Sequence, residues 1–450
     1  MKKIYLLLLI NLTFCLPRVV FAQNSTDTVV TLKQCIEFAL RNQPAVRQAA
    51  IDEQINEKDI RIGLSAWLPQ LSSTGEYEHY FKGSVPVAFS TGTTTTTNGQ
   101  TIAAPNLDEY SSLGLQASQV IYNSDVLLAA KTANYSRLYY KQNTLSSQIN
   151  VLSDVSKAFF DVLLSQKQLD ILNEDITRLQ RSLKDAYSKY QAGTVDKTDY
   201  KQATIALNNS IASRKQTAEA IKAKLAYLKQ IMGVNAGTTL TLAYDSAHYE
   251  SEAYIDTNQQ LDYNKRIEYQ QLQTTKTLQN INVSYYKWQF LPSVSAIGAY
   301  SLNYLSSKFS SLYNNDYPSG YYGLTLSFPI FQGTKRLQNL SKARLQSSRA
   351  DIDIENSQNT INTEYVQSLA SYKSNYTNWV LLKQNVDLAK DVYKVVSLQY
   401  REGIKTYLDV IVAQSDLRTA ELNYYNALFQ LLSSKIDLEK ALGTLTPQSN

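Results

Sequence analysis

The segment from Val151 to Tyr190 reads VLSDVSKAFFDVLLSQKQLDILNEDITRLQRSLKDAYSKY. Apolar or small residues recur in it at alternating intervals of three and four, a heptad pattern typical of helices that pack along their whole length. The positions of this seam are Val151, Val155, Ala158, Val162, Ser165, Leu169, Leu172, Ile176, Leu179, Leu183, Ala186 and Tyr190. At about 1.5 Å per residue, an uninterrupted helix from Asn123 to Tyr190 would be roughly 100 Å long. We therefore expect a rod that spans a distance.

A Gly-bearing turn at Ala192-Gly193-Thr194 follows this helix, and the second half of the chain repeats the pattern. Gly403 follows Gly193, and Gly443 follows Gly233, by 210 positions. The seam recurs at the same offset, at Trp379, Leu382, Val386, Ala389, Tyr393, Val396 and Tyr400. This register indicates an internal duplication. The expected long helices are 123–191 and 334–401, with return helices at 196–232 and 406–442.

Segments with a period of two precede each long helix, around 68–122 and around 291–331. Such alternation is typical of strands with two different faces. Four strands of about ten residues that are apolar on one face match transmembrane β-strands, with a soluble β-sandwich as the alternative. Loops on the extracellular side are expected at 83–109, which holds five consecutive threonines, and at 305–320.

The N-terminus has the features of an export signal over residues 1–22, with two lysines, an apolar run and a small residue, Ala22, at the cleavage point. The mature chain then keeps one cysteine, Cys35, which excludes a disulfide framework and which we expect to be buried. No later segment reaches the roughly 18 apolar residues of a spanning helix. Such an exported chain is soluble, peripheral or inserted as a β-barrel, and its 33 tyrosines favour the barrel.

Charge and composition exclude several functions. Without three basic residues in the leader, 41 basic residues face 39 acidic ones and are interspersed with them, so no nucleic-acid partner is expected. The mature chain has only two histidines, His79 and His248, in unrelated segments. No Cys/His cluster, nucleophile elbow or phosphate-binding glycine loop appears. We expect no enzyme activity, no cofactor and no metal site.

Four strands cannot close a membrane barrel, because the smallest have about eight. The chain must then form oligomers, and two copies with eight strands or three copies with twelve both remain open. A second apolar stripe on the first long helix would allow neighbours on both sides, as in a hollow tube. It comprises Leu145, Ile149, Leu152, Phe159 and Leu163. A solid coiled-coil bundle is the alternative.

A series of short motifs carries a resemblance to a known family. They are Thr31-Leu32-Lys33-Gln34, Ala39–Pro44, Trp67-Leu68-Pro69, Phe328–Gly333, Gly403–Asp409 and Ala441-Leu442-Gly443. In order and with the duplication, the chain resembles the TolC family of outer-membrane efflux and secretion channels over essentially its whole mature length. The corresponding parts would be a first repeat (23–233), an equatorial linker (234–257), a second repeat (258–443) and a tail (444–450).

This resemblance implies a homotrimer in the outer membrane of a Gram-negative bacterium, with outer-membrane lipid around it. Its twelve strands would form one barrel, and its helices would continue as a tunnel across the periplasm. The implied function is the exit duct of a tripartite efflux or type I secretion system, which works with a periplasmic adaptor and an inner-membrane transporter. An exported coiled-coil stalk without a pore is the alternative.

The resemblance also implies a gate at the periplasmic end. Thr198, Asp199, Tyr400 and Asp409 match family positions there, and Lys405 stands where the family has an arginine. A lysine cannot make the planar bidentate contact of a guanidinium.

The same resemblance implies that the hairpin tips at Gly193 and Gly403 dock the adaptor. A second acidic ring, expected three residues after Asp409, is replaced by Val412. The alternative is that Asp199 and Asp409 are ordinary charges at helix starts.

Overall fold

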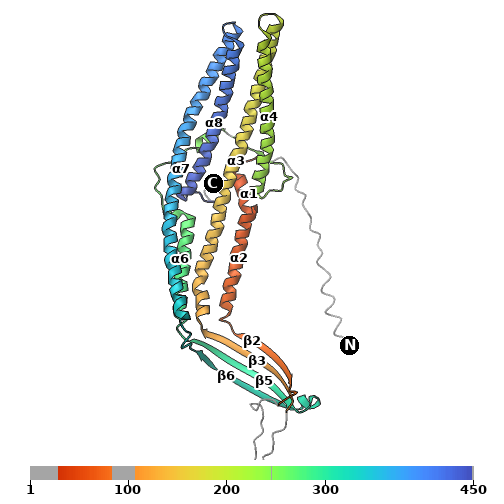
Figure 1. Cartoon of the computed structure of the whole chain (residues 1–450), viewed down its shortest axis with the longest axis vertical. Helices are drawn as coiled ribbons and strands as arrows, with labels where there is room; N and C mark the ends of the chain where they lie inside the picture. The colour runs from red at the N-terminus through yellow and green to blue at the C-terminus, as the bar shows by residue number, and fades with distance from the viewer. Residues whose placement is uncertain (1–28, 84–106, 245, 448–450) are drawn as a thin grey trace, which may run out of the picture.

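A computed structural model describes residues 29–83, 107–244 and 246–447. The molecule is elongated, with two helical hairpins ending at the top of Figure 1 and a curved sheet at the bottom. It is mostly helical with one main sheet of four strands, which confirms the mixed α and β class. The expected signal peptide (1–22) and most of the expected loop at 83–109 lie outside the described residues. Across the described ranges, no helix is both long enough and apolar enough for a membrane span.

Two short helices at the N-terminal end pack beside the first long helix. α1 (Leu32–Asn42) begins at a capping box, in which the hydroxyl of Thr31 accepts from the Gln34 N–H and the Gln34 side chain accepts from the Thr31 N–H. Pro44 starts α2 (Pro44–Ser65), where its missing N–H is dispensable. One extended residue, Gln43, thus separates the two helices.

Two long hairpins make up most of the helical part. In the first, α3 (Ser124–Gln191) is followed by α4 (Lys197–Met232). In the second, α7 (Lys335–Arg401) is followed by α8 (Tyr407–Leu442). α6 (Ile267–Trp288) packs beside α7 as α2 packs beside α3 (Figure 1). The helix order of the first half thus recurs in the second.

Small elements lie at the start of the described chain and after α4. β1 (Val29–Val30) pairs in parallel with β4 (Thr241–Leu242). α5 (Ser246–Glu252) and a 3-10 helix, η2 (Tyr263–Lys265), follow along the chain. The segment expected at 234–257 therefore contains β4 and α5.

The main core lies where the hairpins meet at mid-height. Phe159 and Leu163 of α3 and Leu428 and Leu431 of α8 are fully buried in it. Burying one such side chain contributes about 2 kcal/mol. Cys35 of α1 lies in the same core, where burial raises the pKa of its thiol to about 12.

The heptad seam of α3 faces the protein interior. Val155 and Val162 are fully buried, whereas Tyr190 at the end of the seam is 39 % exposed. The second stripe is also buried at Leu152, beside Phe159. α3 accordingly has helix neighbours on both sides, namely α4 and α8.

The four-stranded sheet has the order β2-β3-β5-β6, and each neighbouring pair is antiparallel. The strands are β2 (Gln70–His79), β3 (Glu109–Tyr122), β5 (Ser293–Ser306) and β6 (Asp316–Ser327). Directly opposed residues share one face of a sheet. One such row runs from Leu71 through Ala117 and Gly298 to Tyr322. The register therefore gathers the apolar positions of the four strands on one face.

The loop expected at 305–320 is shorter in the structure, so that prediction is wrong for part of its range. β5 and β6 both extend into it, and a 3-10 helix, η3 (Phe309–Asn314), lies between them. The rings of Tyr304 and Tyr313 pack with centroids 5.1 Å apart, and Leu312 is fully buried. These contacts order a segment whose polar composition suggested a loop.

Both return helices end at a glycine pressed against backbone. Gly233 and Gly443 adopt left-handed conformations with φ of 71°. A Cβ at Gly233 would lie 2.7 Å from the carbonyl oxygen of Asn42, and one at Gly443 would lie 2.7 Å from that of Lys265. Only glycine permits these approaches, which fix the lower ends of α4 and α8 against the shorter helices.

Candidate functional site at the hairpin tips

Glycine turns close the two hairpins in the same way. Gly193 has a φ of 70° and Gly403 a φ of 78°, both in the left-handed region. The N–H of Gly193 donates to the Tyr190 carbonyl at 3.0 Å, and that of Gly403 donates to the Tyr400 carbonyl at 3.1 Å. A Cβ at either glycine would meet nothing within 4 Å. Backbone conformation, not crowding, thus requires glycine at the tips.

At the start of α8, Asp409 belongs to a capping box. Its Oδ2 accepts from the Thr406 N–H at 2.9 Å and from the Thr406 hydroxyl at 2.8 Å. The ammonium of Lys405 lies 3.8 Å from its other oxygen. The Thr406 hydroxyl, the Thr406 N–H and then Lys405 lower the pKa of Asp409 below its ordinary value. The carboxylate therefore stays charged and satisfies the helix start.

The start of α4 is capped differently. Asp196 is its N-cap, and its Oδ1 accepts from the N–H of Thr198 at 3.2 Å and from the Thr198 hydroxyl at 3.3 Å. Asp199 lies in the first turn and is half-buried. Thr198 is thus engaged within its own helix start.

Tyr400 is a buried contact between the hairpins. Its ring lies 5.8 Å from the ring of Tyr407, and the Lys189 ammonium of α3 lies 3.8 Å above it. Burial raises the pKa of Tyr400, and the nearby carboxylates of Asp199 and Asp185 raise it further. Tyr400 therefore joins the end of α7 to α3 and faces acidic groups of the first hairpin.

The structure brings the five predicted gate residues together only in part. Lys405 and Asp409 form a pair on one helix, and Asp199 lies close enough to Tyr400 to affect its titration. Thr198 belongs to a local cap. The resemblance placed all five near the tips, and it did not predict which of them would pair in this chain.

Two further contact residues, Lys189 and Tyr407, were missed from the sequence. Lys189 precedes the last seam position, and Tyr407 is the first residue of α8. Both positions were recognisable as parts of a tip. Their contact with Tyr400 depends on how the hairpins lie side by side, which no local pattern encodes.

The described part of the chain holds no group of three or more His, Cys, Asp or Glu residues arranged for a metal ion. The tips instead expose apolar side chains. Tyr187 is 47 % exposed and Ile404 is 72 % exposed.

The family described as "Outer membrane efflux protein" matches residues 35–234 and 256–444. The two matched segments include the two hairpins in full, and each ends one residue after the glycine of a return helix. The chain belongs to this family. It is accordingly an outer-membrane protein of the efflux class, a family of channels and not of enzymes.

Similar proteins extend over nearly the whole chain. The outer membrane protein TolC of Vibrio cholerae is 21 % identical over 458 residues, covering 100 % of this chain and 97 % of the relative. The crystal structure of VceC, also from Vibrio cholerae, has a TM-score of 0.71 at 16 % identity and covers 92 % of this chain and 96 % of its own. That of Campylobacter jejuni CmeC has a TM-score of 0.73 at 17 % identity, covering 93 % and 87 %. The fold is thus that of outer-membrane efflux channels.

Proposed function

We propose that the chain forms one third of an exit duct that passively conducts substrates from a periplasmic adaptor and an inner-membrane transporter to the exterior. The observation that carries this proposal is that both long sides of the chain are open edges. These edges run from the sheet to the hairpin tips, and one chain cannot cover them.

Among the residues that the structure describes, the sheet has two unpaired edges, β2 and β6. Its apolar face is uncovered too, with Tyr322 95 % exposed and Leu324 72 % exposed. A bilayer offers no water to satisfy open strand edges, so a sheet that faces lipid must close on itself. Pairing of the β2 edge with the β6 edge of another copy would achieve this closure.

The lower helices continue the same two edges. α2, which leads into β2, exposes Ile51, Ile55 and Ile62. α7, which follows β6, exposes Leu345 and Ile352. The intervals of four and seven residues are those of a heptad seam that lacks its partner.

Towards the tips, α7 exposes a longer stripe. Leu381, Leu388, Val392 and Val395 follow the heptad intervals and are each more than half exposed. On the opposite side of the chain, α4 exposes Ile205. A second copy placed with its α4 against this stripe would cover both surfaces.

The two edges differ, so their contact is heterologous, and we infer that its rotation closes a ring because open strand edges are not tolerated in lipid. We infer three copies, the number that the resemblance to TolC implies, which would give twelve strands. Asp199, Thr198, Tyr400, Lys405 and Asp409 would then line or hold the gate at the tips. A stalk protein would leave the sheet edges and the apolar strand face without partners.

Conductance measurements test the duct. Detergent-purified protein should form ion-conducting pores in planar bilayers and a heat-modifiable band on a gel, which reports an intact barrel. A water-soluble rod that never conducts would contradict the proposal.

Docking at the tips is tested with an exposed residue beside Gly403. Ile404→Asp should abolish export of a pump substrate in cells and leave outer-membrane assembly unchanged, because the side chain is 72 % exposed. Thr194→Asp is the matched change at the Gly193 tip. Unimpaired export by both variants would remove the tips from adaptor docking.

A further inference from the structure

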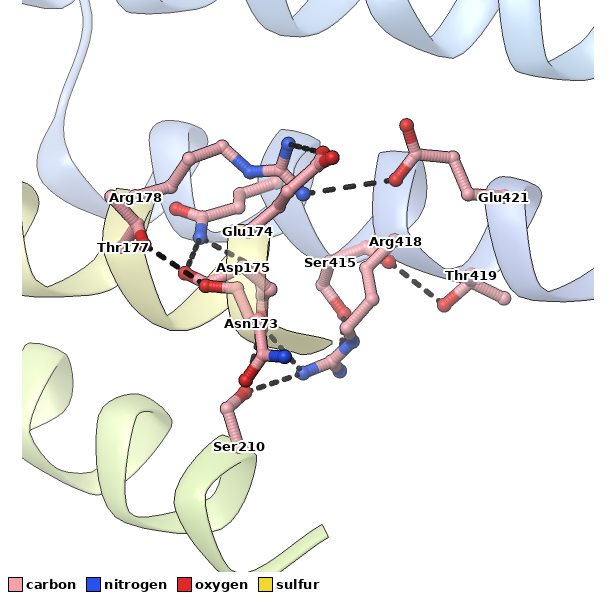
Figure 2. A network of polar contacts seen from close by, with 11 residues as sticks. Asn173, Glu174, Asp175, Thr177, Arg178, Ser210, Ser415, Arg418, Thr419 and Glu421 are labelled. Carbon is pink, nitrogen blue, oxygen red and sulfur yellow. Dashed lines mark hydrogen bonds and ion pairs between the residues drawn. The ribbon is translucent and has the colours of Figure 1, made fainter. Parts of the chain in front are cut away.

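A buried polar network joins the two hairpins well below the tips (Figure 2). Asp175 of α3 is 1 % exposed and accepts from the hydroxyl of Ser210 on α4 at 2.7 Å. From α8 it accepts the amide of Gln414 at 2.8 Å and the guanidinium of Arg418 at 3.3 Å. The Arg418 guanidinium also donates to the Ser210 hydroxyl at 3.0 Å. One carboxylate of α3 thus binds side chains of two further helices, α4 and α8.

The network separates two apolar clusters. The large core, with Phe159 and Leu428, lies at mid-height. The small cluster around Tyr400 and Tyr407 lies at the tips. Asp175 is 16 residues from the end of α3, about 24 Å along the helix. Between the clusters, this network is the buried link that spans α3, α4 and α8 among the residues described here.

The two charged partners differ in their access to water. The side chain of Asp175 is 2 % exposed, whereas that of Arg418 is 29 % exposed. If α8 moved away from α3, Asp175 would lose its contacts with Gln414 and Arg418 and would keep only the one with Ser210. Hydrogen bonds between charged groups are among the stronger ones, so their loss favours the joined arrangement.

We propose that Asp175, with Ser210, Gln414 and Arg418, is a lock that holds the second hairpin against the first and must be released before the tips can separate. Asp175 is its positioning residue, since both hairpins bind to its carboxylate. The lock rests on the proposed duct, whose opening it would control, and it is distinct from the gate residues at the tips.

Tip separation is measured with spin labels on cysteines that replace the exposed tip residues Gln191 and Glu402, in labelled chains diluted with unlabelled protein. Asp175→Asn keeps the size of the side chain and removes its charge. We expect this variant to shift the distance distribution between labels to longer values. The matched control is Asp437→Asn, which removes an exposed ion pair with Lys157 between the same two helices, α3 and α8.

An unchanged distance distribution in Asp175→Asn, or an equal shift in Asp437→Asn, overturns the lock. If Asp175→Asn does not assemble, Ser210→Ala decides, because it removes one donor and keeps the ion pair. It should give a smaller shift in the same direction, and no shift overturns the lock.

Conductance separates this proposal from the duct itself. Asp175→Asn should raise single-pore conductance several-fold, with the heat-modifiable band unchanged, and Asp437→Asn should conduct like the parent. A residue with only a structural role would lower stability and leave both the label distance and the conductance unmoved. A parent protein that never conducts overturns the duct, while the label distances still decide the lock.

Discussion

The helices of the two hairpins are nearly equal in length, but the helix that lies in the protein interior differs between them. α3 and α7 are 68 and 67 residues long, and α4 and α8 are both 36. In the first hairpin the long helix is central, since α3 buries 20 residues and α4 only four. In the second the return helix is central, since α8 buries 16 and α7 only seven. Equivalent sequence patterns therefore fill different places.

This difference follows from which helices meet. α3 packs against α8, so α4 and α7 are left on the outer sides of the pair. A heptad pattern fixes the partner face of a helix and not whether the partner belongs to the same chain. The predicted seam of α7 is buried at Trp379, Val386 and Tyr400. The exposed residues of α7 belong to the separate stripe that contains Leu388, which only another copy would cover.

The largest effect should come from shortening a buried side chain of a central helix. Phe159→Ala leaves a cavity in the core between α3 and α8 and should lower the free energy of unfolding by about 3–5 kcal/mol. Leu388→Ala on the exposed side of α7 should lower the free energy of unfolding of the separated chain by less than Phe159→Ala does. The loss caused by Leu388→Ala should be larger in the assembled protein than in the separated chain. Denaturant titrations below and above the assembly concentration measure both. Equal losses in the separated chain would contradict the division into central and outer helices.

Two glycines of the second hairpin, Gly443 at the lower end of α8 and Gly403 at the tip, should differ in how well they tolerate alanine. Gly443→Ala and Gly403→Ala both impose a left-handed φ on alanine, which costs about 1–2 kcal/mol. Only at Gly443 does the new methyl also collide with backbone, at 2.7 Å from the carbonyl oxygen of Lys265. Gly443→Ala should therefore lower the thermal midpoint more than Gly403→Ala. If Gly443→Ala lowered the thermal midpoint no more than Gly403→Ala, the contact between residue 443 and the Lys265 carbonyl would not limit the side chain.

Contact between the hairpins at the tips should be weaker than at the core. Lys189→Met keeps the length of the side chain and removes the cation that lies over the Tyr400 ring. A loss of about 0.5–1 kcal/mol is expected for a partly exposed cation–π contact. Thermal unfolding measures it, with Lys184→Met on the exposed side of α3 as control. A loss of stability larger than that caused by Phe159→Ala in the core would contradict the prediction that the tip contact is the weaker one.

The smallest effect concerns acid. The folded pKa of Asp409 is below its unfolded value of about 3.9, so its capping contribution is present above that value and is lost as pH falls through the folded pKa. Thr406→Ala removes the two bonds of the Thr406 hydroxyl, one donated to the Asp409 carboxylate and one accepted from the Asp409 N–H, and keeps the bond from the Thr406 N–H to that carboxylate. The variant should then lose less stability than the parent between about pH 5 and pH 3, as read from thermal midpoints. If the parent protein and Thr406→Ala lost the same stability over this pH range, the Asp409 charge would not contribute through the Thr406 hydroxyl.

Much of the fold was readable from local patterns. The helix expected over 123–191 spans Ser124–Gln191 in the structure, and the capping box at Thr31 is present. Both follow from spacing and from residue type, which act within one or two turns. The turn glycines were equally readable, because a left-handed φ favours glycine whatever surrounds it.

The candidate site at the tips and the buried network of Asp175 were harder to predict, because their contacts join segments that are distant in the sequence. Asp175 directly precedes the seam residue Ile176 and resembles the other polar residues of this helix. Nothing near it in the sequence indicates its contacts with Gln414 and Arg418. The central place of α8 depends on tertiary packing in the same way. The ordered connection at Phe309–Asn314 was missed because three buried or stacked side chains outweigh a polar composition.

The central claim is that the outer sides of the chain, β2 with α2 and α4 on one side and β6 with α7 on the other, are contact surfaces for further copies. The native mass of the detergent-purified protein tests this most directly. The proposal predicts a species of three chains, which Leu388→Asp on the exposed stripe of α7 should convert to smaller ones. A parent protein that is monomeric under conditions in which its sheet stays folded would contradict the claim.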